Sequence, residues 1–262
     1  GDAAMEVLTV NDMGGYELFR SAIRERQRVA ILGAGLVGCE FANDLRNAGY
    51  NVDVVEPSLW PLSRLLPEAA ARPLRTALAQ RGVGWHFGAR ALRLDGVRDH
   101  YRLTLSNGSH LEVDAVMAAA GLKPRTNLAS AAGLTVDRGI QVDRFLQTNR
   151  EAIYALGDCT QVEGRLLPYV TPIQYAARAL AKTLAGRLTP VNFPPMPIIL
   201  KTSAHPLVLV PPPDSQGGQW QCQPEGDGIR ALFLDPLGRL TGFALSGQAV
   251  TQQTTLLRRI KN

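Results

Sequence analysis

The feature that most constrains this chain is a glycine-rich turn between a strand-like run and a helix-like run. The turn follows an apolar stretch at 28–32 and opens an amphipathic stretch at 36–47. Its first glycine permits a tight turn, its second lets the backbone approach a pyrophosphate, and its third lets helix and strand pack closely. The helix N-terminus adds partial positive charge and free N–H groups. The turn residues that we expect to contact a dinucleotide are Gly33, Gly35, Leu36, Val37 and Gly38.

A carboxylate at the end of the next strand-like run supports this interpretation. The run 51–56 ends in Glu56, close to the expected distance of about 20 residues from the turn. There its carboxylate can accept hydrogen bonds from both ribose hydroxyls and would repel a 2′-phosphate. No Arg follows within the next few residues. The sequence therefore predicts binding of NAD(H) rather than NADP(H); a tight turn without a ligand is the competing interpretation.

Composition narrows the class of protein. The chain has 262 residues, of which 45% are hydrophobic and 19% charged, as in soluble globular proteins. No apolar stretch approaches the roughly 18–20 residues of a membrane span, and no export signal opens the chain. The three cysteines match neither a zinc spacing nor a CxxC pair, so we expect no metal site and a cytoplasmic location. The net charge of +5 comes without a nucleic-acid motif, so we expect no nucleic-acid partner.

The remaining pattern predicts an α/β chain in four parts. A strand at 7–10 and a helix at 15–26, capped by Asn11 or Asp12, lead into the glycine turn. Further along we expect a helix at 67–81, a strand at 83–87, antiparallel strands at 89–94, 101–106 and 109–113, and a buried parallel strand at 115–119. Asn107-Gly108 suits a type I′ hairpin turn. Beyond these we expect strands at 153–156, 198–201, 207–210, 230–234 and 242–245 and helices at 173–184 and 248–260.

A second motif has the pattern T-x4-I-Y-A-x-G-D and spans Thr148 to Asp158. It resembles the second FAD signature of the flavoprotein reductases that carry two dinucleotide-binding domains. The resemblance implies that Gly157 and Asp158 contact the flavin, with Asp158 accepting a hydrogen bond from the ribityl chain. It also implies that Gly121 passes close to the nicotinamide.

Thr171-Pro172 suits a helix start, with Thr171 as N-cap and Pro172 as the first helical residue. Because of the family resemblance, we favour a helix whose positive end faces the flavin pyrimidine. An ordinary capped helix is the alternative.

Three further stretches resemble the rubredoxin–NAD reductases: 32–45, 177–186 and the segment from Lys201 through the Pro211–Pro213 run. The resemblance implies a Rossmann-like NAD-binding domain with an antiparallel β insertion, part of an FAD-binding domain and a small α+β C-terminal domain. We expect these at 28–120, 121–190 and 191–262, after a linker and helix at 1–27. The family carries another GxGxxG segment, for the adenylate half of FAD, which this sequence lacks. We therefore expect the chain alone to hold FAD weakly or not at all and to be inactive alone.

The resemblance thus implies the C-terminal portion of an oxidoreductase that passes electrons from NADH through FAD to rubredoxin, a small acidic iron–sulfur protein. Glu40 is the candidate for orienting the nicotinamide, although a solvated helix carboxylate is an equally simple interpretation. Lys201 is the candidate contact for the acidic partner. His205-Pro206 is followed by Leu207, which disfavours disulfide-reductase chemistry. The alternatives are a ferredoxin or nitrite-reductase type of flavoprotein and a non-catalytic NAD-binding module.

Overall fold

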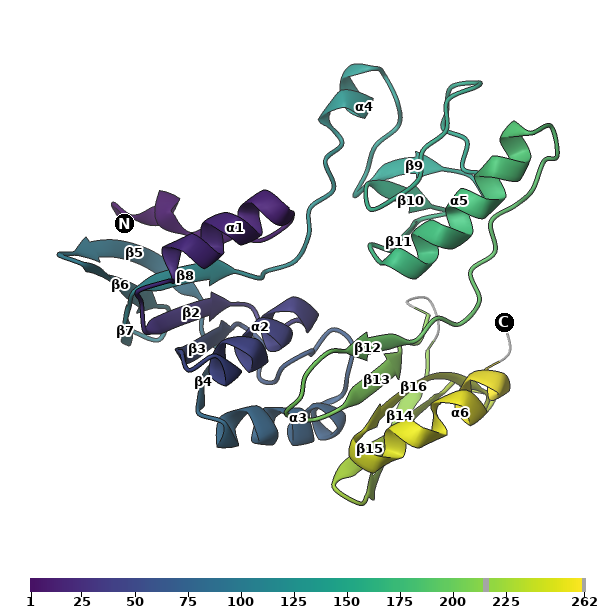
Figure 1. Ribbon diagram of the computed structural model, residues 1–262. Helices are drawn as coiled ribbons and strands as arrows, with labels where there is room; N and C mark the ends of the chain where they lie inside the picture. The colour runs from purple at the N-terminus through teal and green to yellow at the C-terminus, as the bar shows by residue number, and fades with distance from the viewer. Residues whose placement is uncertain (214–216, 261–262) are drawn as a thin grey trace. The chain divides into compact units, whose positions relative to one another are not determined.

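The computed structural model describes residues 1–213 and 217–260, and the chain divides into two compact units (Figure 1). One unit comprises Gly1–Gly121 together with the part of the chain from Pro197 onward, and the other comprises Leu122–Met196. No helix in the described residues combines the length and the apolar character needed to cross a bilayer.

The first unit contains a five-stranded parallel sheet in the order β1-β8-β2-β3-β4. Its strands are β1 (Leu8–Thr9), β2 (Arg28–Leu32), β3 (Asn51–Glu56), β4 (Val83–Phe87) and β8 (Ala115–Ala118). The helices that alternate with them are α1 (Met13–Ala22), α2 (Leu36–Asn47) and α3 (Glu68–Gln80). Asp12 caps α1 by accepting a hydrogen bond from the Gly15 N–H. The predicted Rossmann-like α/β fold is confirmed.

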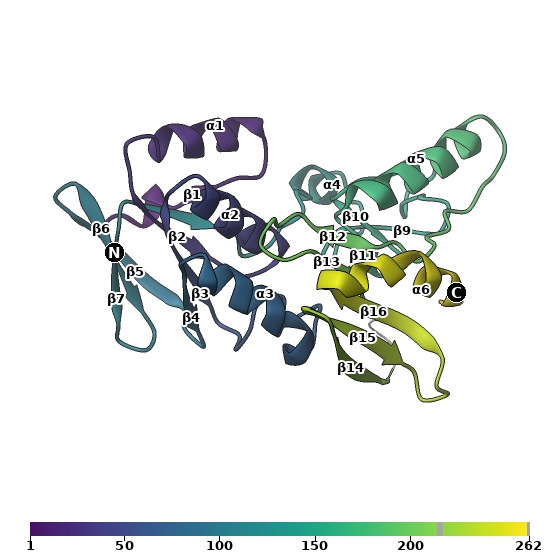
Figure 2. The same cartoon turned by 60° about the horizontal axis from the view of Figure 1, so that its bottom comes forward.

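The two faces of this sheet have different partners (Figure 2). Val29 and Ile31 of β2 belong to a core that also contains residues of α1, α2 and α3. Ala30, which points the other way, belongs to a second core with the antiparallel insertion. Because both faces are covered, β2 is apolar at nearly every position, as the sequence pattern indicated.

The antiparallel insertion forms a separate three-stranded sheet, β5-β6-β7. Its strands are β5 (Ala91–Val97), β6 (His100–Leu105) and β7 (His110–Val113). The predicted type I′ turn is wrong, because Gly108 has a positive φ of 84° and Asn107 does not. The Gly108 N–H instead donates to the Leu105 carbonyl, and the Leu105 N–H donates to the Ser109 carbonyl. This is a three-residue loop, a type I turn followed by a left-handed glycine.

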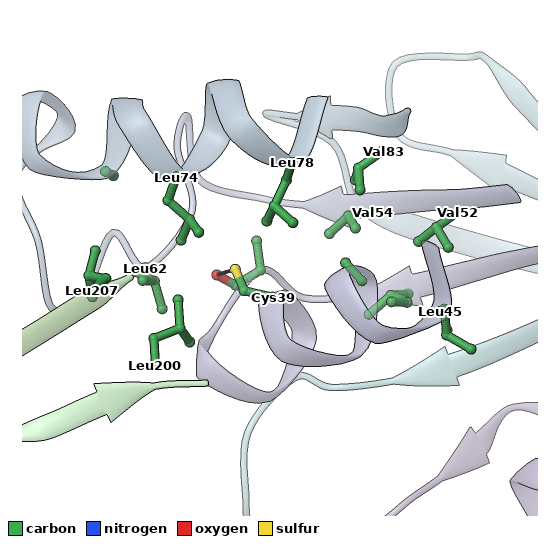
Figure 3. Packing of buried hydrophobic residues seen from close by; sticks show 14 of the residues in the cluster. Cys39, Leu45, Val52, Val54, Leu62, Leu74, Leu78, Val83, Leu200 and Leu207 are labelled. Carbon is green, nitrogen blue, oxygen red and sulfur yellow. Dashed lines mark hydrogen bonds between the residues drawn. The ribbon is translucent and has the colours of Figure 1, made fainter. Parts of the chain in front are cut away.

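A second five-stranded sheet, wholly antiparallel, completes the first unit in the order β12-β13-β16-β15-β14. Its strands are β12 (Ile198–Leu200), β13 (Leu207–Val210), β14 (Gln219–Glu225), β15 (Gly228–Leu234) and β16 (Leu240–Ser246). Leu200 and Leu207 pack into the same core as Leu74 and Leu78 of α3 (Figure 3). The predicted final helix is a 3₁₀ helix, Gly247–Gln252, that continues as α6 (Gln253–Arg259).

The second unit holds α4 (Asn127–Ala131), a small sheet of β9 (Ile140–Val142), β10 (Thr160–Val162) and β11 (Arg165–Leu166), and α5 (Val170–Leu184). The predicted strand at 153–156 is wrong. The chain turns back too tightly there, with both the N–H and the hydroxyl of Thr148 donating to the Ile153 carbonyl, and only the single bridge Gln147↔Tyr154 forms.

The start of α5 also differs from the prediction. Tyr169 is the N-cap, with extended backbone and no side-chain cap, so Thr171 already lies inside the helix and cannot be its N-cap. Pro172 is therefore the third helical residue rather than the first. It is tolerated because the first-turn N–H groups have no partner within the helix in any case.

Candidate functional site

The glycine turn has the geometry that dinucleotide binding requires. Gly33 has a φ of 110°, and a Cβ there would lie 2.7 Å from the Ala119 carbonyl oxygen. A Cβ on Gly38 would lie 2.0 Å from the Gly33 carbonyl oxygen, so helix and strand meet more closely than any side chain allows. A Cβ on Gly35 would meet nothing within 4 Å. The second glycine thus faces open space, where the pyrophosphate of a dinucleotide can come close to the protein backbone.

The helix that follows can accept an anion. Gly35 is the N-cap of α2 and supplies no side-chain hydrogen bond, so no side chain caps its first-turn N–H groups. Leu36 is half-buried and the side chain of Val37 is 44% exposed, so the first turn of the helix is reachable. Open space beside Gly35 and an uncapped helix start together fit a pyrophosphate.

Glu56 lies directly beside this turn. Its Oε2 accepts a hydrogen bond of 2.7 Å from the Ala34 N–H, and its Oε1 accepts one of 2.9 Å from the Ser58 N–H. Each carboxylate oxygen can accept a second hydrogen bond. The carboxylate therefore has a fixed orientation and keeps capacity for two ribose hydroxyls.

Ala34 is held from its other side by a residue that the sequence did not indicate. The Leu62 N–H donates to the Ala34 carbonyl at 2.9 Å, and Leu62 adopts a left-handed φ of 57° in doing so. Such strain in a non-glycine residue persists only where the surroundings impose it, and it gathers at functional sites. Cys39 is buried beneath the turn, where burial raises the pKa of its thiol and keeps it neutral.

Glu40 has a partner that sequence reasoning missed. Its Oε1 accepts a hydrogen bond of 2.8 Å from the backbone N–H of Lys201, at the end of β12. The residue is half-buried, and this hydrogen bond joins α2 to the segment that follows β12. The Glu40 carboxylate is therefore not freely solvated, and one of its oxygens already has a partner within the protein.

The remaining candidates lie at the boundary of the first unit and in the second. Gly121 and Gly157 have φ values of 105° and 103°, and a Cβ on either would meet nothing within 4 Å. Asp158 is exposed and has no hydrogen bond or ion pair with any residue that the structure describes. Gly157 and Pro172 line one small hollow, which brings the Gly-Asp motif next to the start of α5. Thr171, exposed in the first turn of α5, adjoins this hollow through Pro172.

Comparison with known families assigns the chain. Residues 3–180 match the family model "Pyridine nucleotide-disulphide oxidoreductase", and residues 190–260 match "Rubredoxin binding C-terminal domain". The chain belongs to the pyridine nucleotide-disulphide oxidoreductase family. The resemblance to rubredoxin–NAD reductases that the motifs indicated is thereby confirmed.

Individual members of this family are similar over nearly the whole chain. A rubredoxin-NAD(+) reductase of Alcanivorax borkumensis is 48% identical over 257 residues, which are 98% of this chain and 67% of that protein. One of Acinetobacter baylyi is 42% identical over 99% of this chain and 67% of its own length. A ferredoxin reductase structure from Rhodopseudomonas palustris superposes with a TM-score of 0.88 at 25% identity, over 100% of this chain and 67% of that one. The chain thus spans about two thirds of the length of these family members.

Proposed function

We propose that this chain is the NAD-binding and acceptor-binding portion of an enzyme that passes electrons from NADH through FAD to rubredoxin. The observation that carries the proposal is the presence of both parts in one chain. The glycine turn lies in the first unit beside Glu56, whose carboxylate is held in place for ribose hydroxyls. A segment that matches a rubredoxin-binding domain follows at 190–260. A soluble enzyme of the cytoplasm fits this acceptor and the three free cysteines.

In this proposal the residues of the turn bind and orient NADH. The open face of Gly35 and the first turn of α2, from Leu36 through Gly38, receive the pyrophosphate, while Glu56 accepts the ribose hydroxyls. Gly121 leaves room for the nicotinamide, and Glu40 orients it. No protein acid or base is required, because hydride transfer needs only proximity and orientation from the protein. In this proposal the linker and helix at 1–27 lead into an NAD-binding domain at 28–120, followed by part of an FAD-binding domain at 121–190 and a C-terminal domain at 191–262.

FAD fits the second unit on the chemistry of the groups present. The Asp158 carboxylate is an exposed acceptor with no partner in the described residues, which suits a ribityl hydroxyl. The Gly157 backbone is open to close approach, and the N-terminal turn of α5, with Thr171, offers uncapped N–H groups beside it. Bound FAD would accept two electrons from NADH and could pass them one at a time to an iron–sulfur protein.

The acceptor surface in this proposal includes the outer face of β12. Ile199 lies in β12, and Lys201 follows directly after the last residue of that strand. Both are exposed, Ile199 by 59%, while Leu200 between them is buried. An apolar side chain next to an ammonium group on an edge strand suits a small acidic partner, and the chain's net charge of +5 favours its approach.

The test follows rubredoxin reduction by the full-length protein across a salt series. For the wild type we expect bound flavin to be bleached by NADH and rubredoxin reduction to slow steeply with ionic strength, because exposed charges are screened. Lys201→Ala should lower the rubredoxin rate by about two- to tenfold at low salt, as loss of a rim charge does. Lys182→Ala, outside the matched acceptor domain, is the control and should change little.

Three results would contradict the proposal in different ways. Colourless protein that binds NADH would indicate a binding module. Faster reduction of a ferredoxin than of rubredoxin would favour the ferredoxin-reductase alternative. The similarity to the Rhodopseudomonas palustris structure is the reason for testing that alternative. A rubredoxin rate that ignores both salt and the Lys201 substitution would refute electrostatic docking while leaving the NADH step intact.

A further inference from the structure

Leu62 is a buried leucine whose backbone adopts the left-handed conformation, with φ 57°. This conformation is unfavourable for a residue that carries a Cβ, and it persists only where the surroundings impose it. Leu62 is 4% exposed and belongs to the same buried core as Leu200 and Leu207 of the C-terminal sheet (Figure 3). Its carbonyl accepts hydrogen bonds from the N–H groups of Leu65 and Leu66, at 2.8 and 2.9 Å. Side-chain packing and these two bonds therefore hold the strained backbone in place.

The strained conformation directs the Leu62 N–H at the glycine turn. That N–H donates to the Ala34 carbonyl oxygen at 2.9 Å. The same oxygen accepts a weaker hydrogen bond of 3.5 Å from the Cys39 Sγ, and both Ala34 and Cys39 are buried. The Ala34 carbonyl thus points into the protein interior, where two donors fix it.

The direction of this carbonyl sets the direction of the next N–H group. The described residues contain no cis peptide bond, so the Ala34 carbonyl and the Gly35 N–H point in opposite directions from the peptide bond that they share. Because the carbonyl points inward, the Gly35 N–H points outward. Gly35 is exposed, and its N–H has no acceptor in the part of the chain that the structure describes. An outward N–H at the start of α2 is available to a pyrophosphate oxygen.

The preceding peptide of the turn is held by a different group. The Glu56 carboxylate accepts the Ala34 N–H and thereby fixes the peptide that joins Gly33 to Ala34. Two consecutive peptides are thus fixed separately, one by Glu56 and the other by Leu62. Glu56 also presents its carboxylate to the ribose in the proposed function, whereas Leu62 is buried and can act only through Ala34.

We propose that Leu62 is a positioning residue for NADH, whose strained backbone holds the Ala34 carbonyl inward and so aims the Gly35 N–H at the pyrophosphate. The turn is then in its binding conformation before NADH arrives, and no ordering of this peptide opposes binding. The inference rests on the proposed function, because it takes the ligand of the turn to be NADH.

Substitution of Leu62 by Ala and by Gly separates backbone direction from packing. Ala keeps the Cβ that disfavours a positive φ but lacks the side chain that imposes it, so only a small fraction of molecules should hold the turn correctly. NADH affinity of Leu62→Ala should fall about fivefold to thirtyfold, the factor that corresponds to a left-handed penalty of about 1–2 kcal/mol. Gly adopts a positive φ about as readily as a negative one, so Leu62→Gly should bind NADH only about twofold more weakly than the wild type. A role in packing alone predicts the reverse order, since Gly removes more of the side chain than Ala does.

Leu74→Ala is the matched control for loss of packing. Leu74 is fully buried in the same core, on α3, and has no contact with the glycine turn among the hydrogen bonds of the described residues. Its substitution should lower Tm, as Leu62→Ala does, and leave NADH affinity unchanged. Fluorescence titration of this chain with NADH gives the affinities, and thermal unfolding followed by circular dichroism gives Tm.

An ester in place of the Leu62 amide removes the donor alone. Incorporation of the α-hydroxy analogue of leucine at position 62 keeps the side chain and deletes the N–H that reaches Ala34. NADH affinity should fall about twofold to tenfold, as expected for one hydrogen bond of about 0.5–1.5 kcal/mol, whereas the same ester at Leu74 should leave it unchanged. In hydrogen exchange, NADH should slow the Gly35 amide in the wild type, because a pyrophosphate oxygen accepts from it, and should slow it less in the protein with the ester at position 62.

The outcomes separate this inference from the proposed function. Wild-type NADH affinity in the protein with the ester at Leu62, or an affinity of Leu62→Gly no higher than that of Leu62→Ala, would overturn the role of Leu62 and leave the NADH site intact. Absence of NADH binding by the wild type would refute the proposed function and this inference with it. Failure of the full-length protein to reduce rubredoxin would refute only the proposed acceptor, because none of these measurements uses an acceptor.

Discussion

Two glycines of the dinucleotide turn should separate folding from binding. A Cβ on Gly38 would lie 2.0 Å from the Gly33 carbonyl oxygen, whereas real Cβ contacts stay above 3.0 Å, so Gly38→Ala must push helix and strand apart by about 1 Å. Overpacking of this kind costs about 1–3 kcal/mol, and a clash with backbone belongs at the upper end. The better helix propensity of Ala returns about 1 kcal/mol. A net loss of about 2 kcal/mol should lower Tm by about 4–8 °C.

Gly35→Ala is the matched substitution, with the opposite outcome. Gly35 has ordinary extended backbone, with φ −73°, and an added methyl group meets nothing within 4 Å. The free energy of unfolding of Gly35→Ala should differ from that of the wild type by only about 0.5 kcal/mol. Its NADH affinity should fall at least about tenfold, or 1.4 kcal/mol, because the methyl group takes the space where the pyrophosphate approaches.

Thermal unfolding followed by circular dichroism and NADH titration followed by fluorescence measure the two effects in parallel. Wild-type NADH affinity in Gly35→Ala would refute the role of the open face. An unchanged Tm in Gly38→Ala would refute the close-packing argument.

Two other predictions concern cofactor choice and pH. Because the Glu56 carboxylate repels a 2′-phosphate and one charged hydrogen bond contributes about 1.5–3 kcal/mol, NADH should bind about tenfold or more tightly than NADPH in a fluorescence titration; equal affinities would contradict this. Burial alone would raise the pKa of Asp114, but hydrogen bonds from the Arg28 guanidinium and from two backbone N–H groups outweigh it and hold that pKa at about 2, below its ordinary 3.8. This stabilisation, roughly 1–2 kcal/mol after allowance for the partly exposed Arg28, is present above pH 4 and lost as the pH falls toward 2. Asp114→Asn should therefore lower Tm at neutral pH but not at pH 2; a constant difference across that range would count against it.

Several elements were predictable because local pattern and tertiary context agreed. The bounds of β2, α2, β3 and β4 match the expected runs 28–32, 36–47, 51–56 and 83–87. The central strand β2 is covered on both faces, so its apolar run is continuous, and glycine or a polar turn ends each of the four elements. The predicted strand at 153–156 is wrong because these apolar residues lie in a tight loop that forms only a single bridge. The edge strand β14 was missed because its sequence is polar and contains Pro224, as is permitted only where a strand borders solvent.

The sequence by itself determined the dinucleotide turn, since the left-handed φ of Gly33 and the contact of Gly38 with the Gly33 carbonyl arise within the motif, and the spacing of Gly35 follows from the same motif. It also determined the position of Glu56, because the end of a parallel strand next to that turn follows from the βαβ order. Only the tertiary structure decided what Glu40 does. Its partner Lys201 lies 161 residues away, and nothing local in either segment shows that α2 and the β12–β13 loop meet. Hydrogen bonds between distant segments depend on how sheets and helices pack, and that packing is set by the whole core rather than by any single motif.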